Sequence, residues 1–77
     1  MKVIVFGMLK DYFQVEFELT TLPLNISELH QILEQQNPSA SELLKKCRFA
    51  VKNTFVTMHE SLENVQEVLV MPPSSGG

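Results

Sequence analysis

The alternation of apolar and polar positions predicts two kinds of strand. Residues 3–6 are apolar at every position and mostly β-branched or aromatic, which is typical of a strand covered on both faces. Residues 67–71 predict a second strand of this kind, because four apolar side chains follow the first residue. Residues 14–19 instead alternate polar and apolar, which indicates a strand with one face in water. The apolar side chains expected to point inward from this strand are Val15, Phe17 and Leu19.

A period of three to four residues replaces this alternation in the middle of the chain. Asn25, followed three positions later by Glu28, has the spacing of a helix start in which side chains cap the first amide groups. Asn37 and Pro38 end the helix, since the residue before a proline is disfavoured in the helical region. The apolar face of this predicted helix consists of Ile26, Leu29, Ile32 and Leu33.

Shorter patterns complete the order of elements. Residues 39–47 repeat the capping spacing and predict a short second helix. Residues 48–52 and 54–58 predict two short strands around Asn53, a residue type that tolerates turn conformations. Residues 59–66 are mostly polar and predict a loop. The expected order is therefore two strands, a helix, a short helix and three strands.

The first and last predicted strands are the two most apolar, so we expect them side by side in the middle of one sheet. Parallel pairing of segments so distant in the chain requires a long crossover connection. With the main helix on one face, this predicts an α+β fold of the β-grasp (ubiquitin-like) type, with a mixed sheet of about four or five strands. We expect residues 1–71 to form this domain and residues 72–77 to form a flexible C-terminal tail.

The last six residues differ in character from the rest of the chain. Two prolines have a fixed φ and no amide hydrogen, so the strand must stop at Met71 and the chain leaves the domain stiffly. The two serines and two glycines that follow are small enough to enter a narrow channel. All six residues together reach roughly 20 Å when extended. The residues of this predicted insertion segment are Pro72, Pro73, Ser74, Ser75, Gly76 and Gly77.

The α-carboxylate of Gly77 is the one carboxylate whose near neighbours present no side chains to a visiting enzyme. Adenylation would convert it to an acyl-adenylate, which a sulfur or amine nucleophile can attack. The alternative interpretation is an ordinary frayed terminus without a function.

Composition excludes several classes of protein. A length of 77 residues allows one domain, and a net charge of −3 with six scattered Lys and Arg gives no basic stripe for nucleic acid. The longest apolar run, residues 3–9, is far shorter than the roughly 20 residues of a membrane span, so we expect no membrane contact and no signal peptide. The single cysteine, Cys47, rules out an internal disulfide and favours the cytosol.

We expect no catalytic residue in the domain itself. Cys47 follows two leucines and is interpreted as a buried small hydrophobic residue rather than a nucleophile. His30 and His59 lack a Cys or acidic pair at ligand spacing, so no metal site is predicted, and His30 is expected in solvent. Three acidic residues are either a docking site for a basic partner or an ordinary wet surface. They are Glu60, Glu63 and Glu67.

Five features together resemble the small subunit of molybdopterin synthase, a ubiquitin-like sulfur carrier. They are V-I-V-F in the first strand, a Leu-rich helix after a capping position, F-A-V-x-x-x-x-V at 49–56, L-x-N-x-x-E-V at 62–68, and the terminal P-P-S-S-G-G. The resemblance runs over essentially the whole chain. Its most specific element is the doubled proline, because related carriers of the thiamine pathway usually end in Gly-Gly without it.

Two positions depart from the family pattern. The family commonly has Asn where this chain has Lys52, and an Asp-Gly-Asp turn where it has Asn64-Val65-Gln66. Asn64 adopts a positive φ with less strain than most residues, so we expect a turn here in a shifted form.

The resemblance implies a non-catalytic sulfur-donor subunit that binds no cofactor of its own. An activating enzyme of the ubiquitin-activating type would use ATP to adenylate Gly77, and a sulfur donor would convert the adenylate to a thiocarboxylate. The tail would then enter the large catalytic subunit and deliver sulfur to the cyclic pterin precursor in molybdenum cofactor biosynthesis.

The two wholly apolar strands predict a partner interface. If one helix covers one face of the sheet, half of their side chains face away from it as an apolar patch, which a small soluble domain rarely leaves open. By the family pattern the outward residues are Phe6, Phe55 and Met71. The alternative is that the second helical stretch covers them.

Three classes of function stay open at this point. The first is the sulfur carrier of molybdopterin synthase. The second is a sulfur carrier for thiamine synthesis or tRNA thiolation, or a protein modifier attached through Gly77. The third is a non-covalent β-grasp binding module whose tail has no role.

Overall fold

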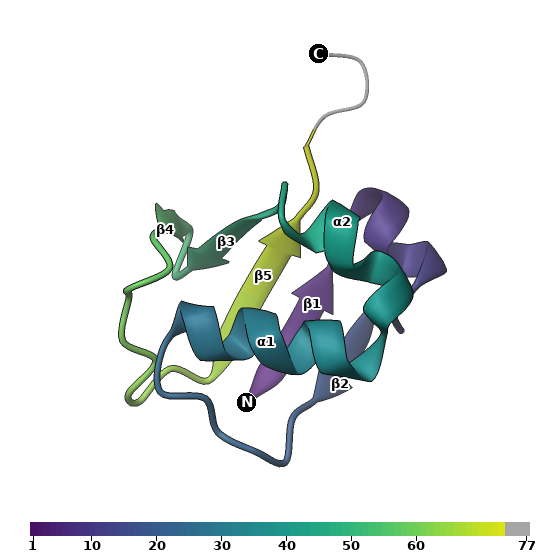
Figure 1. Ribbon diagram of the computed structural model, residues 1–77. Helices are drawn as coiled ribbons and strands as arrows, with labels where there is room; N and C mark the ends of the chain where they lie inside the picture. Colours follow the sequence, from purple (N-terminus) through teal and green to yellow (C-terminus); the bar gives the residue numbers. More distant parts are fainter. Residues whose placement is uncertain (74–77) are drawn as a thin grey trace.

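A computed structural model describes residues 1–73 of the chain. It contains one five-stranded sheet with helix α1 across one face (Figure 1). The strands are β1 (Lys2–Val5), β2 (Glu16–Glu18), β3 (Arg48–Val51), β4 (Thr54–Val56) and β5 (Glu67–Met71). The helices are the 3-10 helix η1 (Gly7–Asp11), α1 (Ile26–Gln36), the 3-10 helix η2 (Pro38–Ala40) and α2 (Ser41–Leu44).

The strand order is β2-β1-β5-β3-β4, so the first and last strands of the domain lie in the middle of the sheet. β1 and β5 run parallel, and every other neighbouring pair is antiparallel. Figure 1 shows these two strands as neighbouring purple and yellow arrows that point the same way. The predicted β-grasp fold, with its central parallel pair, is confirmed.

Alternation along β1 and β5 separates two faces of the sheet. Val3 pairs with Val68 and Val5 with Val70, and all four side chains are buried on the face that α1 covers. Between these pairs, Ile4 lies opposite Leu69 on the outer face, where both are only half-buried. The apolar residues of the two strands therefore serve two surfaces, one inside the domain and one outside it.

The predicted cap begins helix α1. The Asn25 side chain accepts a hydrogen bond from the Glu28 amide at 2.9 Å, and the Glu28 carboxylate accepts one from the Leu24 amide at 3.0 Å. These reciprocal bonds satisfy amide groups that the helix itself leaves without partners. At the other end the helix stops at Gln36, before the Asn37-Pro38 pair.

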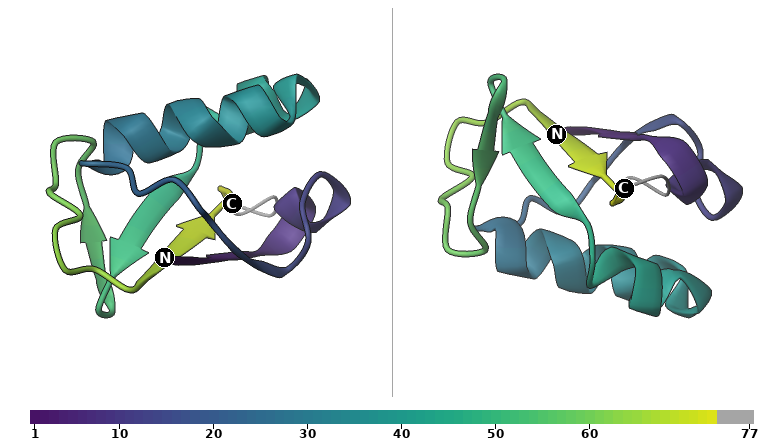
Figure 2. Two further views of the ribbon diagram at one scale, coloured as in Figure 1. Left: turned by 90° about the horizontal axis from the view of Figure 1, so that it is seen from below. Right: turned by 90° about the horizontal axis from the view of Figure 1, so that it is seen from above.

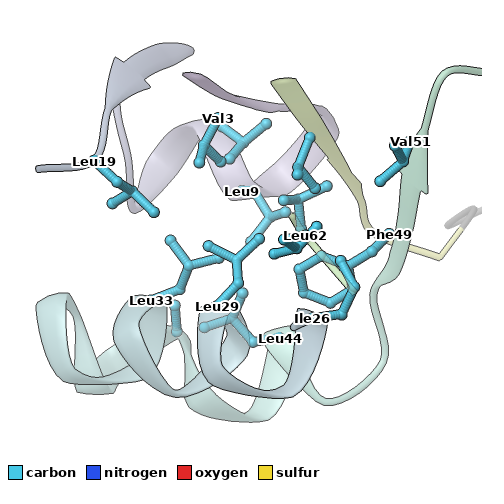
Figure 3. Packing of buried hydrophobic residues seen from close by; sticks show 14 residues of the cluster. Val3, Leu9, Leu19, Ile26, Leu29, Leu33, Leu44, Phe49, Val51 and Leu62 are labelled. Atoms are coloured by element: carbon cyan, nitrogen blue, oxygen red, sulfur yellow. The ribbon is translucent and has the colours of Figure 1, made fainter. Parts of the chain in front are cut away.

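The core lies between the inner face of the sheet and the helices. Leu29 and Leu33 of α1 are fully buried, and Leu44 of α2 packs into the same cluster. Figure 3 shows these side chains facing Leu9 and Phe49 from the opposite side of the cluster. Both α-helices lie on one side of the sheet, as the two views of Figure 2 show, and no helix of residues 1–73 lies across the other side.

Two details differ from the sequence prediction. Residues 7–11 form the unpredicted helix η1, which carries the buried side chain of Leu9 into the core. Val15 was expected to point inward, but its side chain is 51% exposed. It precedes the first residue of β2, a three-residue edge strand. The other two predicted inward residues are confirmed, because Phe17 packs against the core opposite Val3 and Leu19 is buried in it.

The β3–β4 hairpin turns more tightly than predicted. Val51 pairs with Thr54, so the loop has two residues, Lys52 and Asn53, with φ of 51° and 66°. Positive φ at both central positions is the type I′ geometry that suits the twist of two antiparallel strands. The expected turn at Asn53 is confirmed, and Lys52 belongs to that turn rather than to the strand.

Candidate functional site

The base of the C-terminal tail leaves from the centre of the sheet. β5 is held between β1 and β3 and ends at Met71, after which Pro72 is half-buried and Pro73 is exposed. Figure 1 shows this last part of the yellow trace passing beyond the sheet. The remaining predicted insertion residues, Ser74, Ser75, Gly76 and Gly77, lie outside the described residues.

Strand register places a row of small and apolar residues across the outer face. Ile4 pairs with Leu69, Leu69 with Ala50, and Ala50 with Phe55, so these four residues from β1, β5, β3 and β4 share one face. Phe55 is the most exposed of them, at 48%. The row is an apolar surface on the side of the sheet away from α1.

A second row lies next to the base of the tail. Phe6 continues β1 in an extended conformation, and its amide donates to the Val70 carbonyl at 3.1 Å. This brings Phe6 level with Met71, which is in turn the register partner of Arg48. Phe6 is 38% exposed and Met71 is half-buried.

The three residues predicted for an interface thus lie on one face of the sheet. The alternative, in which the second helical stretch covers them, is wrong. α2 packs its Leu44 into the core together with α1, on the opposite side of the sheet. The outer face with Phe6, Phe55 and Met71 is therefore open in this domain.

Arg48 belongs to this surface and was not singled out from the sequence. Its guanidinium carbon lies 3.7 Å from the centroid of the Phe55 ring, so the cation covers one face of that ring. A cation over an aromatic face is attracted by the negative charge of the π system. The sequence did contain a signal for it. Arg48 stands two residues before Ala50 in the same strand, so their side chains point to the same face of the sheet.

The turn before β5 survives the loss of the family's glycine. Asn64 has a φ of 63°, the left-handed conformation that Asn tolerates better than most residues. The amide of Val65 donates to the Leu62 carbonyl at 3.1 Å, which closes the turn. The expectation that Asn64 would replace the glycine conformation is confirmed.

Cys47 is half-buried, and its thiol donates to the Leu43 carbonyl at 3.2 Å. Burial raises the pKa of this thiol from 9.0 to about 11, because the thiolate would lose hydration. Cys47 is therefore protonated in almost all molecules at neutral pH, and a thiol is a poor nucleophile. The interpretation of Cys47 as a packing residue rests on this geometry.

One prediction for the histidines is wrong. His30 was expected in solvent, but its side chain is only 12% exposed. Its Nδ1 lies 3.4 Å from a Glu34 carboxylate oxygen, and its ring lies 6.0 Å from that of Phe49. Its place on α1 explains this burial, because His30 is four residues after Ile26 and three before Leu33 on the buried face of the helix. The Glu34 carboxylate gives the imidazole a polar partner there. Among residues 1–73, no group of three or more potential ligands could hold a metal ion.

The three acidic residues are exposed, but they are distant from the tail along β5. Glu60 and Glu63 lie in the loop before this strand, and Glu67 is its first residue. Pro72 follows the other end of the same strand. Any partner bound through these carboxylates would therefore contact the opposite end of the domain from the tail.

A comparison with protein-family models matches residues 3–77 to the ThiS family. The chain belongs to the ThiS family. Membership confirms the predicted class, a sulfur carrier of the ubiquitin-like type. Among solved structures, this ThiS-family chain is similar to a chain of the complex of subunits 1 and 2 of molybdopterin-converting factor from Helicobacter pylori, with a TM-score of 0.70 and 23% identity. The alignment covers 99% of this chain and 96% of the other, which shows the shared fold. No curated protein matches the chain.

Proposed function

We propose that this ThiS-family protein is the sulfur-carrier subunit of molybdopterin synthase. One observation carries the proposal: the open apolar face, with Phe6 and Met71, adjoins the point where Pro72 leaves the sheet. The tail would then leave the domain directly beside the surface on which the partner docks. A large catalytic subunit with a buried active site requires this arrangement.

The similar structure from Helicobacter pylori supports the same partner class. It is a protein–protein complex of two subunits of molybdopterin-converting factor. We therefore propose that the outer face, including Phe6, Phe55 and Met71, binds a large subunit of this kind. Arg48 lies at its rim over Phe55 and adds the positive charge that would select an acidic or aromatic group on the partner.

The chemistry proposed for Gly77 has three steps. Its carboxylate attacks the α-phosphorus of ATP on an activating enzyme, pyrophosphate leaves, and an acyl-adenylate forms. A donor at the oxidation level of sulfide then attacks the carbonyl carbon, AMP leaves, and a thiocarboxylate remains. In the large subunit the thiocarboxylate sulfur attacks a carbon of the cyclic pterin precursor, a C–O bond at that carbon breaks, and its oxygen leaves as phosphate or water. Water then hydrolyses the resulting thioester, which leaves the sulfur on the pterin as a thiolate and returns the Gly77 carboxylate. The domain supplies no general acid or base to these steps.

A second candidate has an observation of its own in its favour. The matching family model is that of the ThiS family, so a carrier for thiamine synthesis or tRNA thiolation fits the same tail and fold. A protein modifier attached through Gly77 would use the same activated end. The doubled proline at 72–73 is the feature that favours molybdopterin synthase among these.

Intact mass spectrometry tests the proposal. The protein matured with an activating enzyme, ATP and a sulfur source should gain the mass of one oxygen-to-sulfur exchange, confined to the C-terminal peptide. Mixed with a large subunit and the cyclic pterin precursor, it should lose that sulfur as dithiolene appears. Two carriers should be consumed per product, because each brings one sulfur and a dithiolene holds two.

The outcomes separate the classes of function. Gain of sulfur without transfer to the pterin would move the carrier to another pathway. Covalent attachment of the activated chain to lysines would identify a protein modifier. No gain under any condition would leave the non-covalent binding module.

Location is part of the proposal. The single free thiol, Cys47, favours a reducing compartment, and we propose the cytosol. Residues 1–73 contain no helix with the length and apolar character needed to cross a membrane.

A further inference from the structure

β1 and β5 leave the sheet at the same level. Their parallel register pairs Val5 with Val70, and the Phe6 amide continues the ladder with its bond to the Val70 carbonyl. Two residues beyond the Val5–Val70 pair, Gly7 begins η1 on one strand and Pro72 begins the tail on the other. The last hydrogen bond between β1 and β5 therefore lies directly before the turn into η1 on one side and before the base of the tail on the other.

Pro72 lies so close to Gly7 that a residue with a Cβ atom at position 7 would collide with its ring. A Cβ atom placed on Gly7 would lie 2.8 Å from Cγ and 3.6 Å from Cδ of Pro72. Real Cβ atoms essentially never approach another heavy atom to less than 3.0 Å. The pyrrolidine ring thus occupies the space that a side chain of residue 7 would need.

The backbone of Gly7 gives a separate reason for glycine. Its φ is +58°, a conformation that residues with a Cβ rarely adopt. This strain is local to the turn into η1, whereas the contact with the ring concerns the tail. The two effects can be separated by experiment.

We propose that Gly7 is a positioning residue for the tail: the absence of its side chain lets the ring of Pro72 seat against the Gly7 backbone and sets the direction in which the chain leaves β5. The proposal rests on the proposed carrier function and adds to it a residue that is distant from Gly77 in sequence. The chain's other two glycines are the terminal pair, so Gly7 is the only glycine within the domain.

The two prolines couple the position of the Pro72 ring to the direction of the chain that follows it. Pro72 has a fixed φ, and Pro73 restricts the ψ of the residue before it to the extended region. The ring of Pro72 and the start of the tail therefore move as one unit. A side chain at position 7 would push the ring away from β1 and turn the base of the tail.

A double-mutant cycle tests the proposal through the activation of Gly77. Gly7→Ala should lower kcat/KM for activation by roughly five-fold or more, because turning the base of the tail reduces the share of tail conformations that bring Gly77 to the activating enzyme. In the Pro72→Ala background, where the ring is absent, the same substitution should lower it less than about two-fold, since the coupled pair no longer exists. Equal losses in the two backgrounds would overturn the proposal, because the effect would then not pass through the ring.

Two further variants separate contact from strain. Gly7→Asn carries the same Cβ but tolerates positive φ, so it should keep the domain folded and still lower activation. Asn64→Ala imposes strain at a nearly equal φ of 63° at the other end of β5, so it should lower stability and leave activation unchanged. Gly7→Asn with wild-type activation would contradict the proposal.

A spin label reports tail direction without any enzyme. A nitroxide on Ser75→Cys, in a Cys47→Ser background, should broaden a defined set of domain amide signals. Gly7→Asn should change that set when Pro72 is present and leave it unchanged in the Pro72→Ala protein. If Gly7→Asn leaves the broadened amide signals unchanged in both the Pro72 and the Pro72→Ala proteins, Gly7 does not position the tail. If the wild-type protein is never adenylated, the proposed function fails, and the spin-label measurement still decides the role of Gly7.

Discussion

The guanidinium carbon of Arg48 lies over the Phe55 ring, 3.7 Å from its centroid. Both side chains stand on the outer face of the sheet, on β3 and β4, and Phe55 is also adjacent to Ala50 in register. The pair makes one end of the open face both apolar and positively charged. This combination is common at protein interfaces, where aromatic residues and Arg are enriched.

The first prediction concerns Phe55. Replacing it with Ala should weaken binding to a large subunit by roughly ten-fold or more, since exposed aromatic residues at an interface contribute strongly. The isolated domain should keep its stability to within about 1 kcal/mol, because Phe55 is 48% exposed. Calorimetric titration and urea unfolding measure the two effects.

Leu22→Ala is the matched control for Phe55→Ala. Leu22 is even more exposed, at 69%, but it lies in the loop before α1, beside the start of β5 rather than its end. Binding should be unchanged by this substitution. A loss of affinity as large as that of Phe55→Ala would mean that the outer face is not the docking surface.

The second prediction places a charge beside the tail. Phe6→Lys should weaken binding to the large subunit by roughly thirty-fold or more, because a charge at the centre of an interface loses its hydration on binding. Circular dichroism should show that the free domain stays folded, since the Phe6 side chain is already partly in water. Normal affinity, or an unfolded domain, would show that Phe6 does not serve the outer face.

A third prediction concerns the end of the chain. Deleting Gly77, or adding one residue after it, should abolish adenylation in a pyrophosphate-exchange assay and leave the unfolding curve unchanged. The reason is that the core consists of residues of the domain, from Val3 to Val70. Continued adenylation and thiocarboxylation of the shortened chain would rule out the tail mechanism.

Much of this arrangement follows from sequence pattern alone, and the reason is visible in β1 and β5. Strands that are apolar at every position are typical of the middle of a sheet, and β1 and β5 lie there side by side. The helix cap at Asn25 was equally readable, because its bond to Glu28 is local.

What the sequence does not predict depends on contacts between distant segments. Nothing in the sequence around Gly7 indicates that Cγ of Pro72, the residue after the last strand, lies 2.8 Å from the place where a Cβ of residue 7 would be. His30 stands four residues after Ile26 and three before Leu33, so helical periodicity places it on the buried face of α1, but its neighbour Phe49 belongs to β3 and could not be read from the helix. Val15 is exposed because β2 is a short edge strand, and edge position is a property of the assembled sheet.

The fourth prediction follows from the raised pKa of Cys47. The unfolded thiol ionises near 9.0 and the folded one near 11, so folding favours the protonated form. The contribution of this group to stability is fully present below pH 9.0 and is lost as the pH rises through 11. Urea unfolding at a series of pH values should show a steeper alkaline loss in the wild type than in Cys47→Ala.

The same thiol should react slowly. At pH 8 its thiolate fraction should be roughly a hundred-fold lower than that of a thiol with the ordinary pKa, and alkylation by iodoacetamide should slow accordingly. Mass spectrometry of the folded and urea-unfolded protein provides the comparison. Equal rates in the two states would show that the thiol is not shielded.

The fifth prediction concerns the core. Leu33→Ala should lower the free energy of unfolding by about 2–5 kcal/mol, since Leu33 is fully buried in α1 and its loss leaves a cavity. Gln31→Ala, on the exposed side of the same helix, should change it by less than about 0.5 kcal/mol. Equal effects of the two substitutions in urea unfolding would contradict the packing described for α1.

The central position of β5 also decides how the domain withstands force. A partner that grips the tail pulls along the axis of β5, whose hydrogen bonds to β1 and β3 run across that direction. Such a pull loads both ladders in shear, so many bonds must break together rather than one after another as in unzipping an edge strand. The tail can therefore be drawn into a tight channel, or pulled out of one, while the domain behind it stays folded.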